Sequence, residues 1–468
     1  MIKQIIRASI LNPQPDGSVD FLPDAALAAD AAGTLLFVGP FAELHKQLGQ
    51  GAPPVDRRGG ILIPAMFDNH THIPQHPIRG RFSEGIVGNP PGGRLLASLN
   101  RNVFPIERRA VEESWARRTI LQFRKDTLAN GVIGGATYVT VHPVAARLAL
   151  ELLPATWSVG LVFMDQNCPA YLRNNIGTLD EDVAGLVAIA GGGPASRLIL
   201  TDRFAMACST PLRLRASSLA RHFDLRMQTH LNEQLGEKRA VERDLYPNRG
   251  TYTDIYAQDG LLARRAILAH CVWMSDEELA LVRDSGAAIA HCPTSNSLLG
   301  SGIMPLERVK RSGMDYALCT DVGASPTTSL LCEMVQFLSV HSGRTGHANA
   351  TEALFRTTLA PARMLGLDRR YGHFAPGKSL SFIEIDSGET IDAADLEPDP
   401  EAVIQRHVLG LSALPAPPPA MPQLFKGNLT APTELAALHT GVRIAMERLK
   451  QKIRAVVVEG QCQFMRSP

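Results

Sequence analysis

The sequence predicts an α/β protein in which a (β/α)8 barrel of the TIM type is joined to a small β-sandwich domain built from both chain ends. Between residues 61 and 321, short runs of apolar and β-branched residues alternate with stretches that space apolar residues three and four apart. Apolar strands that alternate with helices indicate a parallel sheet covered on both faces. Eight such units in about 300 residues are typical of a closed barrel. An open doubly wound sheet is the alternative, although no glycine-rich phosphate-binding turn follows the first strand.

The first part of the β-sandwich spans residues 1–60, where apolar stretches alternate with turn sequences such as NPQPDGS and therefore predict strands. The barrel spans residues 61–368. Its predicted strands are the runs 61–72, 131–140, 157–165, 196–204, 225–233, 265–271, 286–292 and 315–321. Strand-like sequence returns at 373–386 and 455–460, so residues 369–468 are assigned to the second part of the β-sandwich.

An insert interrupts this C-terminal part. The sequence LPAPPPAMP at 414–422 predicts a stiff Pro-rich linker. The following segment, 433–454, predicts a helix, because its apolar residues fall on one helical stripe. They are Leu435, Leu438, Val442, Met446, Leu449 and Ile453. This stripe can pack on its own chain or form the contact of a homodimer.

Composition and charge exclude several classes of protein. With 45% hydrophobic and 20% charged residues, the 468-residue chain is a globular protein and not a disordered one. Its 47 basic and 46 acidic residues give a net charge of +1, so we expect neither nucleic acid nor a membrane as partner. We expect no signal peptide, because the opening MIKQIIRASILNPQPDG lacks a long apolar core and a small-residue cleavage site. We expect no membrane span, because uncharged apolar runs of about 18 residues are lacking. The seven scattered cysteines, without CxxC pairs, are typical of reduced thiols and predict a cytoplasmic protein.

The ends of several predicted strands carry metal-binding side chains. His70 and His72 are two residues apart in the first strand and therefore project from one face. His230, His270 and Asp321 lie at the ends of the fifth, sixth and eighth runs. Because catalytic groups of (β/α)8 enzymes lie at the C-terminal ends of strands, we predict a shared metal site. Imidazoles with a carboxylate suit Zn²⁺ or Fe²⁺, and the bound ion would lower the pKa of water to supply hydroxide near neutral pH.

Glu233 is the predicted proton carrier. It follows His230 by three residues, at the transition from strand to loop, where it can reach the mouth of the metal site without being a ligand. A carboxylate in that place can move a proton between water and a leaving group. The alternative is an ordinary glutamate of a surface loop.

Several motifs resemble those of a known family. PAMFDNHTHIPQ, HLNE, AHC, AHCPTSN and TDVG occur in the order and spacing of the amidohydrolase superfamily. Within it, further segments are similar to those of guanine deaminases: HTHIPQ (70–75), FPIE (104–107), MDQNCPAYL (164–172), DRFAMACS (202–209) and TYTDIY (251–256). The resemblance covers roughly residues 60–366.

The resemblance implies a hydrolytic deaminase that converts guanine to xanthine and ammonia. It implies one zinc ion per subunit, held by His70, His72, His230 and Asp321. His270 would hydrogen-bond the attacking hydroxide or the substrate, and Glu233 and Asp321 would handle protons. Gln75, Arg203 and Phe204 would read the purine, since an amide matches a ring N–H edge, a guanidinium donates to an oxo group and a phenyl ring stacks.

The sequence also departs from the family pattern. Gln166 stands where many relatives have a basic residue, Asp202 where proline is common, and Ser379 and Ser381 interrupt a typical GKxADxVVID pattern. The two serines concern the small domain, whereas Gln166 and Asp202 leave the ring of the substrate open: a pterin, 8-oxoguanine or an s-triazine would undergo the same chemistry. A non-catalytic barrel scaffold is the alternative of another class. A cysteine nucleophile is disfavoured, because Cys271 and Cys292 each follow a histidine directly and neighbours in a strand point to opposite faces.

Overall fold

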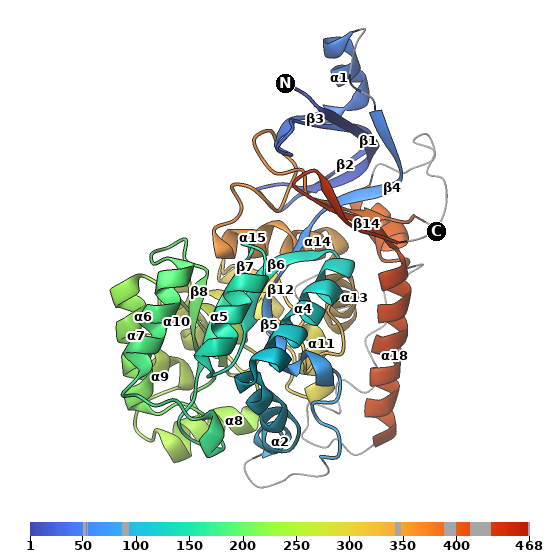
Figure 1. Ribbon diagram of the computed structural model, residues 1–468. Coiled ribbons are helices and arrows are strands. Elements are labelled where there is room, and N and C mark those ends of the chain that lie inside the picture. Colours follow the sequence, from blue (N-terminus) through green and yellow to red (C-terminus); the bar gives the residue numbers. More distant parts are fainter. Residues whose placement is uncertain are drawn as a thin grey trace.

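The computed structural model describes residues 1–49, 53, 55–86, 93–341, 348–387, 399–411 and 432–466. It contains an eight-stranded parallel sheet and a separate seven-stranded sheet (Figure 1). The predicted Pro-rich linker at 414–422 lies outside the described residues.

The eight-stranded sheet is the predicted barrel. Its strands pair in chain order and in parallel, which confirms the (β/α)8 prediction and makes the open doubly wound alternative wrong. The strands are β5 (Met66–His72), β6 (Val132–Tyr138), β7 (Trp157–Phe163), β8 (Leu198–Asp202), β9 (Arg226–Leu231), β10 (Ile267–His270), β11 (Ala288–His291) and β12 (Tyr316–Leu318). Each falls within one of the predicted runs.

Helices follow each strand and cover the outside of the barrel. They are α4 (Glu113–Ala129), α5 (Pro143–Leu152), α6 (Leu179–Ala190), α7 (Thr210–Phe223), α8 (Leu235–Arg239), α9 (Tyr252–Gln258), α10 (Asp276–Ser285), α11 (Pro293–Leu299), α12 (Leu306–Arg311), α13 (Leu330–His341), α14 (Ala350–Thr357) and α15 (Leu359–Leu365). Side-chain caps start α7, α9, α10 and α14. The Ser275 side chain, for example, accepts a hydrogen bond from the backbone N–H of Glu278 and so starts α10.

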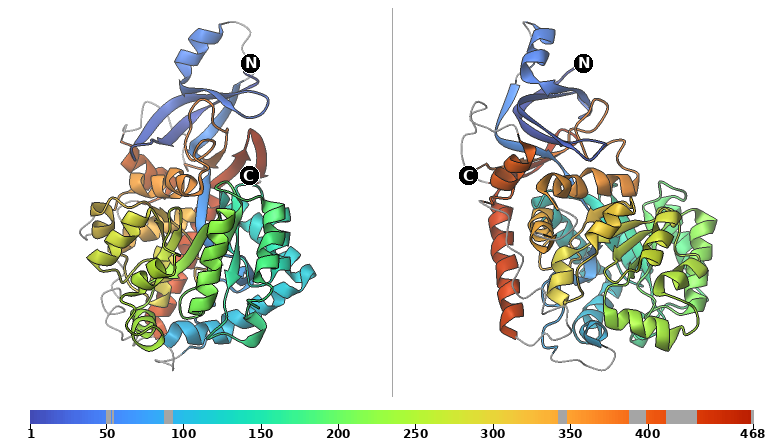
Figure 2. Two further views of the ribbon diagram at one scale, coloured as in Figure 1. Left: turned by 90° about the vertical axis from the view of Figure 1, so that its left-hand side faces the viewer. Right: turned by 180° about the vertical axis from the view of Figure 1, so that it is seen from behind.

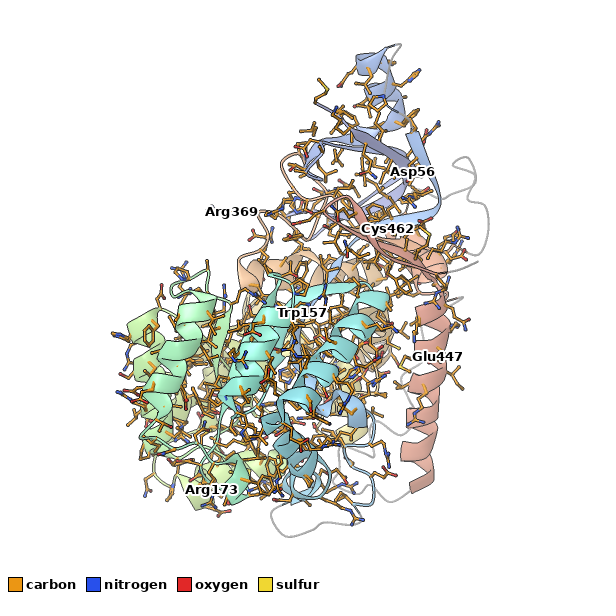
Figure 3. All side chains as sticks on the ribbon, in the orientation of Figure 1. Asp56, Trp157, Arg173, Arg369, Glu447 and Cys462 are labelled. Atoms are coloured by element: carbon orange, nitrogen blue, oxygen red, sulfur yellow. The ribbon has the colours of Figure 1, made fainter. Side chains whose placement is uncertain are left out.

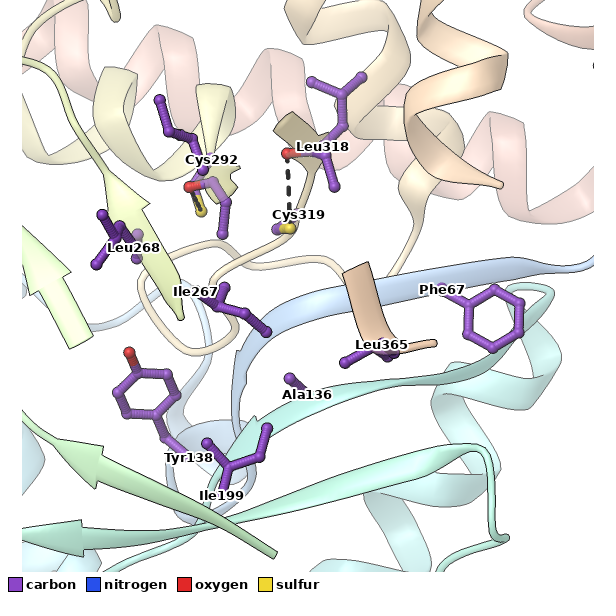
Figure 4. Close-up of a cluster of buried hydrophobic side chains, with 14 of the residues drawn as sticks. Phe67, Ala136, Tyr138, Ile199, Ile267, Leu268, Cys292, Leu318, Cys319 and Leu365 are labelled. Atoms are coloured by element: carbon purple, nitrogen blue, oxygen red, sulfur yellow. Dashed lines mark hydrogen bonds between the residues drawn. The ribbon is translucent and has the colours of Figure 1, made fainter. Parts of the chain in front are cut away.

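Apolar side chains fill the barrel and its seams with the helices (Figure 4). Phe67, Ala136, Ile199, Ile267 and Leu318 come from different strands and are all buried. Strands that are buried on both faces need such near-continuous apolar sequence, which is why the strands could be recognised in the sequence.

A few hydrogen bonds join the first and last strands and complete the barrel. The backbone N–H of Asp321 donates to the carbonyl of His70 over 2.9 Å, and that of His72 donates to Val322 over 2.5 Å. The buried carboxylate of Asp68 accepts the backbone N–H of Thr320 over 3.1 Å. The residues just beyond β12 are therefore held directly beside the end of β5.

Both chain ends form the second sheet, as predicted. Its hydrogen-bonded order is β15–β14–β13–β4–β1–β2–β3, one continuous sheet. These strands are β1 (Gln4–Pro13), β2 (Val19–Ala29), β3 (Leu35–Pro40), β4 (Val55–Pro64), β13 (Phe382–Ile385), β14 (Ile453–Val458) and β15 (Gln461–Met465). Ile6, Leu27, Leu62, Phe382 and Val457, each from a different strand, gather in one apolar cluster. The sheet therefore curves around a core of its own.

The second sheet lies at the end of the barrel where the strands begin. Strand β4 ends at Pro64 and β5 begins at Met66, so the predicted run 61–72 contains the end of one strand and the whole of the next. The backbone N–H of Ala65, between them, donates to the carbonyl of Ser381 over 3.2 Å. At the opposite end, where the strands finish, the barrel is covered by the loops that follow the strands. The domain boundaries at 60 and 368 stay predictions.

Helix α18 (Pro432–Gln451) lies alongside the barrel (Figures 1 and 2). It ends at Gln451, not at residue 454 as predicted, because Ile453 already belongs to β14. The helix packs against α11 and α13, and its Val442 and Leu449 side chains are buried. This face of the stripe contacts its own chain.

We expect Leu449→Ala to lower the free energy of unfolding by about 2–5 kcal/mol, since Leu449 is fully buried and its removal leaves a cavity. Ile444 on the same helix is 65% exposed, so Ile444→Ala is the matched control, with an expected change within about 0.5 kcal/mol. Urea denaturation of both variants measures the difference. Equal stabilities would contradict the packing described here.

All seven cysteines are free thiols. Six are buried, while Cys462 on β15 is exposed (Figure 3). Among the described helices, none has both the length and the apolar character needed to cross a bilayer.

Candidate metal centre and substrate pocket

The four predicted ligand side chains converge at the end of the barrel. One ligand atom from each of His70, His72, His230 and Asp321 lies within 4.8 Å of all the others, and all four residues are buried. Oδ1 of Asp321 is 3.3 Å from Nε2 of His70 and 3.2 Å from Nε2 of His72. Nε2 of His230 is 3.3 Å from Nε2 of His72.

The local backbone explains this convergence. Residues 70 and 72 alternate onto one face of β5, and His230 belongs to β9 across the barrel. Asp321 lies just beyond β12 with a φ of 54°, and His270 ends β10 with a φ of 72°. Non-glycine residues rarely adopt this left-handed conformation, and such local strain is found mainly at functional sites.

The donor set fits a cation. Nδ1 of His70 is buried without a hydrogen-bond partner among the described residues, and Nε2 has only the 3.3 Å contact with Asp321. Such a state is costly for polar atoms unless an ion or ligand engages them. Burial lowers the pKa of His70 to about 4, and burial with the neighbouring imidazoles holds the pKa of His230 well below its ordinary value. Neutral imidazoles have the free lone pair that a metal requires. Although burial acts to raise it, His70 and His72 hold the pKa of Asp321 well below its ordinary value.

Glu233 and His270 face each other beside this cluster. Oε2 of Glu233 is 3.7 Å from Nε2 of His270, and both side chains are buried. Burial raises the pKa of Glu233. The pKa of His270 is also raised, because the Glu233 and Asp321 carboxylates outweigh the effect of its burial. A carboxylate and an imidazole with pKa values shifted in this way are typical partners in proton transfer.

Three residues that the sequence reasoning left without a role hold these side chains in place. The Ser295 hydroxyl donates to Oδ2 of Asp321 over 2.5 Å, and the Asn296 side-chain oxygen is 2.9 Å from Nδ1 of His270. The Ser301 hydroxyl donates to Oε1 of Glu233 over 2.8 Å. Ser295 and Asn296 belong to the motif AHCPTSN, so the motif could have indicated that they contribute to the site.

The predicted substrate residues line one cleft next to the cluster. Gln75, Arg203 and Phe204 lie on one concave space, as is usual for the binding site of a small molecule. His72, His230, Glu233 and Asp321 open onto the same space, while apolar walls come from Phe82, Leu95, Leu99, Leu299 and Ala324. All the predicted site residues except His70 and His270 therefore line this cleft.

Leu95 and Leu99 are pocket residues that the sequence reasoning missed. Leu95 belongs to α2 (Gly93–Ser98) and Leu99 begins η2 (Leu99–Val103), both within the long excursion between β5 and α4. Neither residue lies at a strand end or in a motif with polar chemistry, so the sequence offered no signal for them.

Comparison with known proteins agrees with this geometry. The sequence model of the Amidohydrolase family matches residues 61–411, three quarters of the chain. The chain belongs to the amidohydrolase family. Among amidohydrolases, it is 30% identical over 390 residues to the guanine deaminase of Escherichia coli strain K12, covering 82% of this chain and 86% of that protein. It is 31% identical over 428 residues to the guanine deaminase of Rattus norvegicus, covering 86% and 92%.

Two solved structures share the whole architecture. The structure of E. coli guanine deaminase superposes with a TM-score of 0.77 at 25% identity, covering all of both chains. The atrazine chlorohydrolase TrzN of Arthrobacter aurescens TC1 shares the fold, with a TM-score of 0.71 at 18% identity and coverage of 98% and 95%.

Two departures from the usual amidohydrolase motifs leave the cleft intact. Gln166 does not line the cleft. Its side-chain amide instead donates to Tyr246 Oη over 2.8 Å. Asp202 accepts the Tyr256 hydroxyl over 2.7 Å, whereas its neighbour Arg203 pairs with Glu107 over 2.6 Å. Asp202 and Arg203 therefore have separate partners, although they are neighbours in the chain.

Proposed function

We propose that this amidohydrolase is a metal-dependent hydrolytic deaminase of an aminopurine, and that it converts guanine and water to xanthine and ammonia. The observation that carries the proposal is the meeting of a His/Asp cluster, an acid–base pair and the Gln75–Arg203–Phe204 set at one cleft. The guanine deaminases among its relatives support the same substrate. The enzyme class is hydrolase acting on C–N bonds of cyclic amidines.

The cluster would hold one zinc ion per subunit through His70, His72, His230 and Asp321; Fe²⁺ suits the same donors. When bound, the ion would lower the pKa of a water molecule and so provide a nucleophile near neutral pH.

The acid–base residues then move the protons. Glu233 takes a proton from the attacking water and delivers it to the amino group that leaves C2 of guanine as ammonia. Protonated His270 donates a hydrogen bond to the developing negative charge, and the neighbouring Glu233 and Asp321 carboxylates raise its pKa. Asp321 takes the remaining proton of the former water and passes it to the ring nitrogen N3, so that C2 becomes the carbonyl of xanthine and the aspartate is regenerated.

Substrate recognition rests on the other wall of the cleft. Arg203 donates to the 6-oxo group, the Gln75 amide bonds a ring N–H, and Phe204 stacks on the ring. Phe204 lies beside the cluster, with its ring centre 6.5 Å from that of His230. A flat ring held against Phe204 would therefore lie next to the reacting groups.

A screen for ammonia release tests the proposal. We expect the metal-replete protein to release ammonia from guanine with a higher kcat/KM than from pterins, 8-oxoguanine or amino-s-triazines. A higher kcat/KM for one of those rings would make that ring, and not guanine, the preferred substrate. No release from any of them would favour the non-catalytic scaffold.

Two further proposals concern the environment of the enzyme. We propose a homodimer in the cytoplasm. The free thiols support the compartment. The α18 stripe does not support the dimer, because its Val442 and Leu449 side chains pack on their own chain. Light scattering of the full-length chain measures the subunit count.

A further inference from the structure

Glu107 is a buried carboxylate that bonds two residues of the cleft at once. It ends α3 (Phe104–Glu107), which is the segment FPIE, and is 1% exposed. Oε1 accepts the Gln75 side-chain N–H over 2.9 Å, and Oε2 accepts Nη1 of Arg203 over 2.6 Å. Gln75 and Arg203 therefore lie side by side across a single carboxylate.

This carboxylate fixes which way the Gln75 amide points. A glutamine amide can present either its NH2 group or its oxygen to a ligand, because the two ends have nearly the same shape. A carboxylate only accepts hydrogen bonds, so it must be faced by the NH2 end. Oε1 of Gln75 is consequently turned away from Glu107, and it is buried without a hydrogen-bond partner among the described residues.

The same carboxylate holds Arg203. Among the described residues, the guanidinium donates only to Glu107, and it lies over the Phe104 ring with 5.3 Å from Cζ to the ring centre. An arginine carries five N–H donors, so most of them stay available to a ligand. The ion pair is buried on both sides, with side-chain exposures of 4% and 2%. The attraction between Arg203 and Glu107 therefore offsets the cost of burying the two charges.

We infer that Glu107 sets the hydrogen-bonding polarity of the cleft, by fixing Gln75 as an acceptor beside Arg203 as a donor, and so selects rings with a lactam edge. A lactam presents an N–H donor next to a C=O acceptor, which matches this pair. An aminated edge presents a ring nitrogen acceptor next to an NH2 donor. It would place an acceptor against the Gln75 oxygen and a donor against the Arg203 guanidinium, so neither hydrogen bond could form. The inference rests on the proposed function, deepens it by naming the substrate class, and makes Glu107 a positioning residue.

Glu107→Gln tests this polarity with little change of shape. In that variant the new amide can face Gln75 in either orientation, so Gln75 is free to turn its NH2 group toward a ligand. Arg203 also loses its counter-charge. Glu107→Asp keeps the charge but is one methylene shorter, so it cannot reach both partners equally well. Glu112→Gln, at an exposed glutamate nearby, is the matched control.

Binding of hypoxanthine and adenine gives a readout that does not need turnover. Hypoxanthine carries the lactam edge and adenine the aminated edge, and neither has the 2-amino group of guanine. Using calorimetry on the metal-loaded full-length protein, we expect the parent to bind hypoxanthine more tightly than adenine. Glu107→Gln should reduce this preference by about 10- to 100-fold. Glu107→Asp should lie between, and Glu112→Gln should match the parent.

A purely structural role for Glu107 would weaken both ligands by the same factor, and an unchanged preference in folded Glu107→Gln would overturn the inference. Circular dichroism reports folding, and if Glu107→Gln does not fold, the preference of Glu107→Asp decides. A parent without preference for hypoxanthine would also overturn it. Failure of the proposed function looks different: the parent would release no ammonia from guanine, whatever its preference between the two ligands.

Discussion

Replacing Glu233 with glutamine is expected to lower kcat for ammonia release by about 100- to 10,000-fold, the usual contribution of a general acid–base group. Glutamine keeps the size of the side chain and can still accept the Ser301 hydrogen bond that Oε1 of Glu233 receives. It cannot carry a proton from water to the leaving amine. The metal content should stay at the parental level, because Glu233 is not one of the clustered ligands.

The measurement pairs steady-state ammonia release with elemental analysis of the same samples. Glu277→Gln, at an exposed glutamate of α10, is the control and should behave like the parent in both assays. Parental turnover by Glu233→Gln would remove Glu233 from the mechanism. A variant that has lost its metal would instead place Glu233 among the ligands.

His230→Gln is expected to lose the bound metal and to lower kcat/KM at least about 100-fold. Substitution of residues that merely support a ligand already costs about 10- to 100-fold in metal affinity or activity, so loss of a ligand should cost more. His230 is buried at the centre of the cluster, and its Nδ1 lies 2.5 Å from the carbonyl oxygen of Arg203. That contact orients Nε2 toward the other ligands, and glutamine cannot reproduce it.

Thermal unfolding separates metal binding from catalysis in this variant. A ligand that binds only the folded state raises the melting temperature, so added zinc should raise the Tm of the metal-depleted parent. It should not raise that of His230→Gln. His222→Gln, at an exposed histidine of α7, is the control. An equal zinc-dependent rise in Tm for His230→Gln would show that His230 is not required for binding.

The barrel could be predicted because strands buried on both faces need apolar residues at nearly every position, a pattern that is visible without any partner strand. The candidate ligands could be predicted for a related reason: His70, His230 and Asp321 end such runs, and parallel strands bring their ends to one rim. The second sheet was predicted only as a β unit. Its order depends on the pairing of β4 with β13, which are more than 300 residues apart, and local sequence does not encode such a register.

The positioning residues illustrate what strand patterns miss. Ser295 and Asn296 lie in the first turn of α11, where their side chains meet Asp321 and His270 only because the helix starts beside the rim. Glu107 reaches Arg203 from a segment 96 residues earlier in the chain. Each of these contacts depends on how two loops approach each other, and neither loop carries a periodic signal of its own.

The junction between β5 and β12 has a consequence for the making of the enzyme. Three of the four clustered ligands, His70, His72 and His230, precede Asp321 in the chain, and the backbone of Asp321 is itself hydrogen-bonded to His70. During synthesis, a nascent chain shorter than 321 residues lacks part of its ligand set, however well its earlier strands have folded. The full ligand set and the closed cylinder therefore both require the chain up to Asp321, so we expect a polypeptide that ends before this residue to be catalytically inactive.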